Sequence, residues 1–286
     1  MQRTVSLLRV LDILGEAYAA HGDETWGWAE GDLIFYTYPP ELGYAPLVKN
    51  ATAVIQVECG VGYDVAPWGP LRVYESEIWR HYCFAKHNEP LARRRNSWVI
   101  PWAFDRAAWP LGSGTGKYVS FLGRLMPDKG IRALVELARK LPDTLFKVAS
   151  TDAMNGLWVR NEPPPSNVEF VGPVLGGDRA QFLGAAFAHL CPTEFVEPLC
   201  GSAIEAMLCG TPVVTSNYGG FVETVEEGVT GFRCTSVDEM VDAIKRADDL
   251  DRRWCRALTQ QKFSIEAAVP RWRKALAQMR ALQCSS

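Results

Sequence analysis

The sequence predicts an α/β protein in which helices cover both faces of a parallel sheet, and three observations carry this prediction. Strand-like and helix-like patterns alternate from about residue 117 to residue 249, as they do in successive βαβ units. Loops that contain glycines and charged residues follow several of the strand-like runs. With 286 residues and 48% hydrophobic content, the chain can bury one large core or two modest ones.

The alternating half supplies most of the predicted elements. Short apolar runs bounded by turn residues predict strands, and apolar residues at helical spacing predict helices. The loops around Arg124, Glu197 and Gly219 each follow a predicted strand, so we expect them to meet at one edge of the sheet. Strands are predicted at 117–122, 145–150, 168–171, 187–191, 212–215 and 231–234, and helices near 130–141, 178–186, 201–209, 220–226 and 236–249.

The first 110 residues form a weaker pattern. Leucine and valine residues recur at helical spacing near the start of the chain, which predicts an amphipathic helix there. Other apolar runs in this part predict short strands and one more helix. The predicted elements are helices Thr4–Ala20 and Glu77–Lys86 and strands Asp32–Tyr38, Ala53–Glu58, Leu71–Tyr74 and Trp98–Pro101.

A glycine-rich run divides the two parts of the chain. Gly112–Gly116 would need a helix after it to act as a phosphate-binding loop, but a strand-like run follows, so we favour a linker. This division predicts a first domain of residues 1–111, a linker of residues 112–116 and a second domain of residues 117–262. The remaining stretch, residues 263–286, is apolar-periodic and basic.

Charge and cysteine content argue against several classes of protein. The net charge is −3 and the pI is about 5.9, so no broad basic surface for nucleic acid is expected. The eight cysteines show no Cys-x-x-Cys spacing and no signal-peptide pattern begins the chain, which favours free thiols in a reducing compartment. No apolar run is long enough to span a bilayer. We therefore expect a cytoplasmic protein that does not bind nucleic acid.

Two glutamates separated by seven residues are the most informative feature of the chain. Glu197 precedes a helical pattern that Gly201 opens, and Glu205 lies about one turn inside it. The first turn of a helix presents free backbone N–H groups and the positive end of the helix dipole, which suits an anionic ligand. One carboxylate could therefore face the far end of a ligand, while the other reaches the ribose of a nucleotide whose phosphates lie at the helix start.

Three segments resemble, in order and spacing, the signatures of retaining glycosyltransferases of family 4, also called glycosyl transferases group 1. The stretch 190–231 resembles their Glu-x7-Glu signature, and Gly123–Gly130 resembles their Gly-Arg-Leu-x-Pro-x-Lys-Gly loop. The third segment is Gly219–Glu223, followed by Gly228 and Gly231. The resemblance implies the GT-B fold, in which two Rossmann-like domains with parallel sheets face each other across a cleft.

The resemblance also implies how the two ends of the chain are built. A usual member begins with a strand and a glycine-rich loop, which this sequence does not show at its start, so we expect a reduced N-terminal domain. In the GT-B fold the last helix crosses back to the first domain, and we expect this of residues 263–286. Peripheral membrane contact through the basic residues of that stretch is the alternative.

The activity that the resemblance implies is transfer of a hexose from a nucleoside-diphosphate sugar to an acceptor hydroxyl, with retention of configuration. Arg124 and Lys129 would clamp the diphosphate without a metal ion; solvated surface cations are the alternative. Glu205 would bind the ribose hydroxyls or only stabilise the helix start, and Glu197 would contact the donor sugar, with Glu194 as a competitor. The predicted donor-binding residues are Gly123, Arg124, Lys129, Val174, Glu197, Pro198, Leu199, Cys200, Gly201, Ser202 and Glu205.

Two positions depart from the family pattern. Many members have glycine where this chain has Cys200, which could be a reactive thiol beside a helix start or a packed side chain. On the acceptor side, Glu58 stands where many members carry a histidine; it could orient the acceptor, accept its proton or bond the neighbouring backbone. The nucleotide base is expected near Gly172–Val174, where nothing distinguishes uracil from guanine or adenine.

The expected cofactors and partners follow from the same residues. No convincing Asp-x-Asp motif accompanies them, so we expect neither a metal ion nor another cofactor. The predicted partners are a UDP-, GDP- or ADP-linked sugar and a hydroxyl acceptor, which could be a saccharide, a lipid carrier or a small molecule. The alternatives are a non-catalytic subunit that binds a nucleotide sugar and a nucleotide-sugar epimerase of the same fold. The sequence leaves the oligomeric state open.

Overall fold

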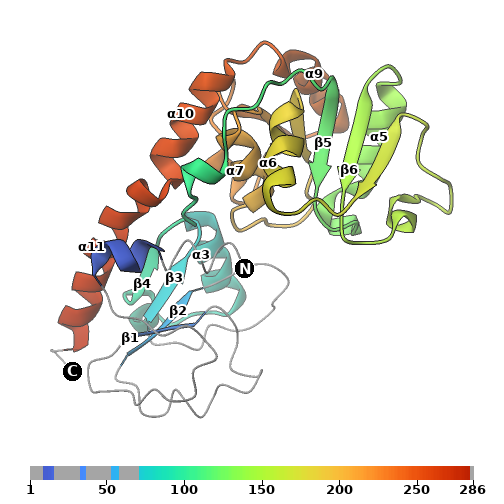
Figure 1. The fold of residues 1–286 in the computed structure, drawn as a ribbon. Coiled ribbons are helices and arrows are strands. Elements are labelled where there is room, and N and C mark those ends of the chain that lie inside the picture. The colour runs from blue at the N-terminus through green and yellow to red at the C-terminus, as the bar shows by residue number, and fades with distance from the viewer. Residues whose placement is uncertain (1–8, 16–32, 37–52, 58–70, 284–286) are drawn as a thin grey trace. The chain divides into compact units, whose positions relative to one another are not determined.

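The structure, a computed structural model, describes residues 9–15, 33–36, 53–57 and 71–283 of the chain. These residues form two compact units, each with its own parallel sheet (Figure 1). The first unit draws on residues 1–104 and 265–286, and the second comprises residues 105–264. The α/β class with parallel sheets, predicted from the sequence, is confirmed.

The second unit is built on six parallel strands in the order β10-β9-β8-β5-β6-β7. The strands are short apolar runs, and β8 and β9 are buried along their whole length, as expected where helices cover both faces. All six predicted strands are present, with ends that differ by at most one residue. They are β5 Tyr118–Leu122, β6 Leu145–Ala149, β7 Val168–Gly172, β8 Ala188–Cys191, β9 Val213–Ser216 and β10 Gly231–Cys234.

The helices of the second unit include one that the sequence did not predict. This helix, α10, has a polar sequence in which only Cys255, Thr259 and Phe263 are buried, so its apolar stripe is narrow. Asp251 caps it by accepting hydrogen bonds from two backbone N–H groups of the first turn. The helices are α5 Ile131–Lys140, α6 Gly176–Ala185, α7 Gly201–Leu208, α8 Phe221–Thr224, α9 Val237–Ala247 and α10 Arg252–Phe263, with short 3-10 turns η2 Arg106–Ala108, η3 Pro127–Lys129 and η4 Met154–Leu157.

The order of the strands places a switch point between β5 and β8. The chain passes from β5 to β6 and β7 on one side, and then returns to β8, β9 and β10 on the other side. Loops that leave the carboxyl ends of β5 and β8 therefore diverge to opposite faces of the sheet. In open α/β sheets ligands bind in the crevice outside such a point. The fold thus directs attention to the loops 123–130 and 192–200.

The segment predicted as a linker lies inside the second unit. The backbone N–H groups of Gly112, Gly114 and Gly116 donate to the carbonyl oxygens of Cys209, Gly184 and Ala185, at 2.9, 3.1 and 2.8 Å. These glycines therefore allow the chain to lie close against α6 and the end of α7, instead of leaving it free between two bodies. The boundaries between the units fall at 104/105 and 264/265. The sequence predicted them around 112–116 and at 262/263.

The first unit has a four-stranded parallel sheet in the order β1-β2-β3-β4. Its core joins this sheet to the long helix α11, whose buried residues include Ala268, Trp272 and Met279. Helical residues 9–14 add Val10 and Leu11 to the same core. The elements are β1 Leu33–Tyr36, β2 Ala53–Val57, β3 Leu71–Tyr74, β4 Ser97–Val99, α3 Glu77–Lys86, α4 Leu91–Arg94 and α11 Ile265–Gln283. Among the helices that the structure describes, none is long and apolar enough to cross a bilayer.

Candidate active site

The loop after β5 is fixed to its neighbours through its backbone. The N–H of Gly123 donates to the carbonyl of Ala149 at 3.2 Å, and the N–H of Leu125 donates to Asp152 Oδ2 at 2.6 Å. At its end Gly130 has a φ of 77°, and a Cβ on this residue would lie 1.8 Å from the carbonyl oxygen of Pro192. Only glycine fits this combination of dihedral angle and close approach. The loop is therefore pressed against the loop that follows β8.

Backbone hydrogen bonds join the loop after β8 to the loops after β5 and β9, at Glu194 and Glu197 respectively. The N–H of Glu194 donates to the carbonyl of Asp128 at 2.8 Å, which joins the first two loops. The N–H of Gly220 donates to the carbonyl of Glu197 at 2.6 Å, which joins the third. Tyr218 adds a hydrogen bond from its hydroxyl to the carbonyl of Thr193 at 2.8 Å. The expectation that these loops meet at one edge of the sheet is thus confirmed.

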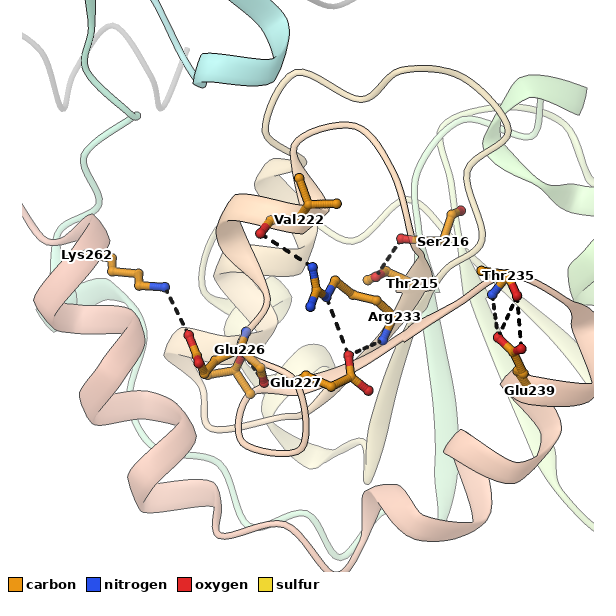
Figure 2. Close-up of polar contacts among 10 residues, drawn as sticks. Thr215, Ser216, Val222, Glu226, Glu227, Arg233, Thr235, Glu239 and Lys262 are labelled. Carbon is orange, nitrogen blue, oxygen red and sulfur yellow. Dashed lines mark hydrogen bonds and ion pairs between the residues drawn. The ribbon is translucent and has the colours of Figure 1, made fainter.

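A cluster of polar contacts lies around α8, which follows the β9 loop (Figure 2). Arg233 of β10 reaches α8, where its Nη1 lies 3.5 Å from the carbonyl oxygen of Val222. Its Nε lies 3.4 Å from Glu227 Oε2, and its backbone N–H donates to the same oxygen at 3.0 Å. Lys262 of α10 lies 3.5 Å from Glu226. These contacts tie α8, and with it the glycines that precede it, to the sheet and to α10.

The side chains of Lys129 and Glu197 form a buried ion pair at this edge. Lys129 Nζ lies 2.9 Å from Glu197 Oε2, and the two side chains are 15% and 4% exposed. The ammonium group also lies 4.4 Å from the centroid of the Phe195 ring, within the range of a cation–π contact. Burial, together with the charges of Glu194 and Glu197, raises the pKa of Tyr218. The edge therefore holds a cation and carboxylates in a partly water-excluded setting.

Arg124 lies in the same loop as Lys129 but differs from it in its contacts. Its side chain is half-buried, and it makes no ion pair or hydrogen bond with any residue that the structure describes. Glu194, the competitor of Glu197, is exposed, whereas Glu197 is buried. The spacing in the sequence and the burial in the structure thus both favour Glu197 over Glu194 as the site residue.

The start of α7 has an unusual backbone. Cys200, at the position before the helix, has a φ of 62°, which costs an L-amino acid with a side chain roughly 1–2 kcal/mol. Its Sγ lies 3.8 Å from Cys191 Sγ and 3.7 Å from Ser202 Oγ, and the residue is 7% exposed. Contact with Cys200 and burial raise the pKa of Cys191 well above its usual value. Cys191 and Cys200 therefore pack against each other beneath the helix start.

Glu205 has a cationic partner that the sequence did not point to. Arg179 of α6 places Nε at 2.7 Å and Nη2 at 2.5 Å from Glu205 Oε2. The side chain of Glu205 is 6% exposed and that of Arg179 is 28% exposed. The helical pattern near 178–186 was predicted, but periodicity alone does not indicate which residue of another helix faces Arg179.

Three more of the predicted site residues differ in where they lie. Leu199 is 1% exposed, so its side chain belongs to the core and only its backbone could reach a ligand. Val174 is half-buried and lies between Gly172, which has a φ of 75°, and the start of α6. Glu58 lies outside the described residues, so its role stays a prediction.

The part of the chain that the structure describes offers no group of three or more His, Cys, Asp or Glu side chains able to hold a metal ion. The Asp-x-Asp spacing does occur at Asp249-Leu250-Asp251, but there Asp251 accepts the hydrogen bonds that cap α10. A capping role accounts for this aspartate without a ligand.

A family model described as glycosyl transferases group 1 matches residues 105–254, almost the whole second unit. The chain belongs to this family. The resemblance found in the sequence is therefore confirmed, and the loops described above lie within the matched residues.

Relatives of known name match between two fifths and one half of the chain. A glycogen synthase of Mycobacterium tuberculosis is 33% identical over 152 residues, which are 49% of this chain and 36% of that protein. Spore coat protein SA of Bacillus subtilis is 28% identical over 153 residues, 49% of this chain and 41% of that protein. A D-inositol 3-phosphate glycosyltransferase of a Mycobacterium species is 34% identical over 121 residues, 40% of this chain and 27% of that protein. The matched part thus spans well under half of each relative.

Solved structures match more of the chain at lower identity. AviGT4, a glycosyltransferase involved in avilamycin A biosynthesis, superimposes with a TM-score of 0.72 at 19% identity, covering 99% of this chain and 90% of that one. Anabaena HepE in complex with UDP-glucose gives a TM-score of 0.71 at 18% identity, covering 86% of this chain and 79% of that one. At these identities the likeness establishes the fold, which is GT-B.

Proposed function

We propose that this chain transfers a hexose from a nucleoside-diphosphate sugar to an acceptor hydroxyl, with retention of configuration and without a metal ion. The observation that carries the proposal is the buried pair of Lys129 and Glu197, which lies at the switch point of the sheet beside the start of α7. Taking the Glu197 carboxylate and much of the Lys129 side chain out of water costs free energy, and such charged groups are often found at functional sites. Membership of the glycosyl transferases group 1 supports the class of reaction.

The chemistry needs positive charge where the leaving group forms. The bond between the anomeric carbon and the diphosphate oxygen breaks, and the acceptor oxygen bonds to that carbon on the same face. The acceptor proton passes to the departing phosphate oxygen, so the products are a glycoside and a nucleoside diphosphate. Lys129, Arg124 and the first N–H groups of α7 are the groups that would stabilise the negative charge on that oxygen.

The two glutamates would divide the rest of the donor between them. In this proposal Glu197 accepts hydrogen bonds from hydroxyls of the donor sugar, while Lys129 donates to its Oε2 and holds the carboxylate in place. Glu205 accepts hydrogen bonds from the ribose hydroxyls. Because the two residues lie before and inside the same helix, the phosphates between sugar and ribose would fall at the helix start.

UDP-glucose is the donor to test first. Anabaena HepE, which shares the fold, has been crystallised with UDP and with UDP-glucose. The named relatives include a glycogen synthase and a D-inositol 3-phosphate glycosyltransferase, so their names leave the class of acceptor open beyond a hydroxyl. We also propose a cytoplasmic location, because the six cysteines that the structure describes are buried free thiols.

The proposal can be tested without knowing the acceptor. Slow hydrolysis of UDP-, GDP- and ADP-sugars would be measured as nucleotide release, with and without a chelator. Glu197→Ala and Lys129→Ala are each expected to lower the rate by about 100–1,000-fold, the loss typical of one electrostatic group in an active site. Lys140→Ala is the matched control, because its ion pair with Asp238 has side chains 41% and 82% exposed.

Three results would distinguish a metal-independent retaining enzyme from a metal-dependent enzyme and from a non-catalytic subunit. A rate that survives the chelator, and a first-formed sugar with the donor's anomeric configuration by NMR, would support metal-independent retention. Loss of the rate on chelation would overturn metal independence. If calorimetry showed tight binding of a nucleotide sugar but no turnover occurred, the chain would be a non-catalytic nucleotide-sugar-binding subunit and not an enzyme.

A further inference from the structure

Arg179 and Glu205 form an ion pair close to the start of α7. Two of its nitrogens contact the same carboxylate oxygen, Nε at 2.7 Å and Nη2 at 2.5 Å from Oε2. The residues belong to different helices, α6 and α7, which pack side by side at the sheet. Arg179 lies in the first turn of α6 and Glu205 is the fifth of the eight residues of α7, and both helix starts face the carboxyl edge of the sheet.

The local structure of α6 does not explain an arginine at this position. Arg179 is the fourth residue of the helix, in its first turn, where the positive end of the helix dipole disfavours a cation. Its side chain is 28% exposed, less than that of a freely solvated arginine. The contact with Glu205 therefore supplies the reason for its place.

Glu205, for its part, needs a cation from outside its own helix. It is the fifth residue of α7, so the N–H groups of the first turn lie before it. A carboxylate that is 6% exposed stays ionised only when paired and hydrogen-bonded. Two guanidinium nitrogens contact the same oxygen, Oε2, which holds this oxygen from two directions.

We propose that Arg179 positions Glu205 for ribose recognition and so sets the preference of this site for ribonucleotides. This inference rests on the proposed function, in which Glu205 accepts the ribose hydroxyls. A charged and oriented carboxylate accepts hydrogen bonds from the 2′- and 3′-hydroxyls of a ribose at once, whereas a rotated carboxylate cannot. Arg179 acts through Glu205 and is a positioning residue.

The test compares ribonucleotides with their 2′-deoxy analogues. Calorimetry on the whole chain first identifies which of UDP, GDP and ADP binds most tightly. The wild type is expected to bind that nucleotide about tenfold or more tightly than its 2′-deoxy form, the value of one hydrogen bond to a charged group. Arg179→Met is expected to reduce the preference below about threefold, and Arg179→Lys, which keeps the charge, to leave an intermediate preference.

Kinetics and controls separate positioning from a defect in folding. For the nucleotide sugar, Arg179→Met should raise KM with little change in kcat, as expected when uniform binding is lost. In a Glu205→Gln background, where the carboxylate that Arg179 would position is already absent, adding Arg179→Met should change the preference no further. Arg139→Met is the matched control, since it breaks an arginine–glutamate pair of 3.1 Å whose side chains are 47% and 66% exposed.

The outcomes distinguish this inference from the function on which it rests. If Arg179→Met kept the full preference for the ribonucleotide while Glu205→Gln lost it, Arg179 would have no positioning role. If the wild type bound a nucleoside diphosphate but did not distinguish it from the 2′-deoxy form, the inference would fail and the proposed function would stand. If the wild type bound none of the three nucleotides, both would fail.

Discussion

The middle and the carboxyl end of the β5–β8 junction hold two polar clusters of opposite character. In the middle, Ser120 Oγ lies 3.0 Å from His189 Nδ1, and both residues are fully buried. At the end, Lys129 and Glu197 form an ion pair from the loops that follow the same two strands. Both clusters are shielded from water, but only the second one carries charge.

The difference follows from the partners that each place can offer. Burial, and after it the positive charge of Arg179, lower the pKa of His189 to about 3, so the imidazole is neutral at ordinary pH. A strand interior brings no carboxylate to this ring. The loops beyond the strands, in contrast, place an ammonium 2.9 Å from the Glu197 carboxylate. The neutral pair therefore belongs to the packing of the sheet, whereas the charged pair belongs to the loops that the proposed function uses.

The largest change in stability is expected at Gly130, where the loop that carries Lys129 lies close against the backbone of Pro192. Gly130→Ala should lower the free energy of unfolding by about 2–5 kcal/mol, from the positive φ and from the clash with Pro192. Gly228→Ala is the matched control, because Gly228 has a similar φ of 70° but no atom within 4 Å of an added Cβ. It should cost only about 1–2 kcal/mol. Equal losses in urea unfolding would show that the loop contact contributes nothing.

The next largest change in stability is expected on lowering the pH, because of the neutral buried pair of Ser120 and His189. The pKa of His189 is lowered in the folded state, from 6.5 to about 3, so below pH 6.5 the unfolded chain binds a proton that the folded chain does not. Stability from this group is complete above pH 6.5 and is lost as the pH falls toward 3. Between pH 6.5 and pH 5 the loss should reach about 2 kcal/mol, at 1.36 kcal/mol per pH unit.

A double variant isolates the contribution of His189. Ser120→Ala with His189→Leu removes both polar partners, which is expected to be nearly neutral at pH 7.5 because neither is left unsatisfied. The other histidines of the chain are common to both proteins, so their titration cancels in the comparison. If urea unfolding at pH 5 and pH 7.5 showed the same difference in wild type and double variant, His189 would not be the neutral buried group described above.

The sequence predicted the frame of the site better than its contacts. Strands of the second unit could be placed because each is an apolar run with turn residues at its ends, and parallel order then brings Lys129 and Glu197 to one edge. Arg179 could not be found in this way, since it comes from another helix 26 residues before Glu205. The strand-like run after Gly112–Gly116 predicts a linker, but a glycine-rich sequence does not show whether the segment packs; its hydrogen bonds to Cys209, Gly184 and Ala185 show that it does.

The smallest effect is expected for a charged pair on the outside of the second unit. Arg139 Nη2 and Glu162 Oε2 lie 3.1 Å apart, close to the 2.9 Å of the Lys129–Glu197 pair, but the two side chains are 47% and 66% exposed. Water and salt screen such a pair, and ordering two long side chains offsets much of the attraction, so Arg139→Met should change stability by less than about 0.5 kcal/mol. Unfolding in low and high salt would measure this. A loss approaching that of a buried pair would mean that distance, and not burial, decides which charged pairs matter in this fold.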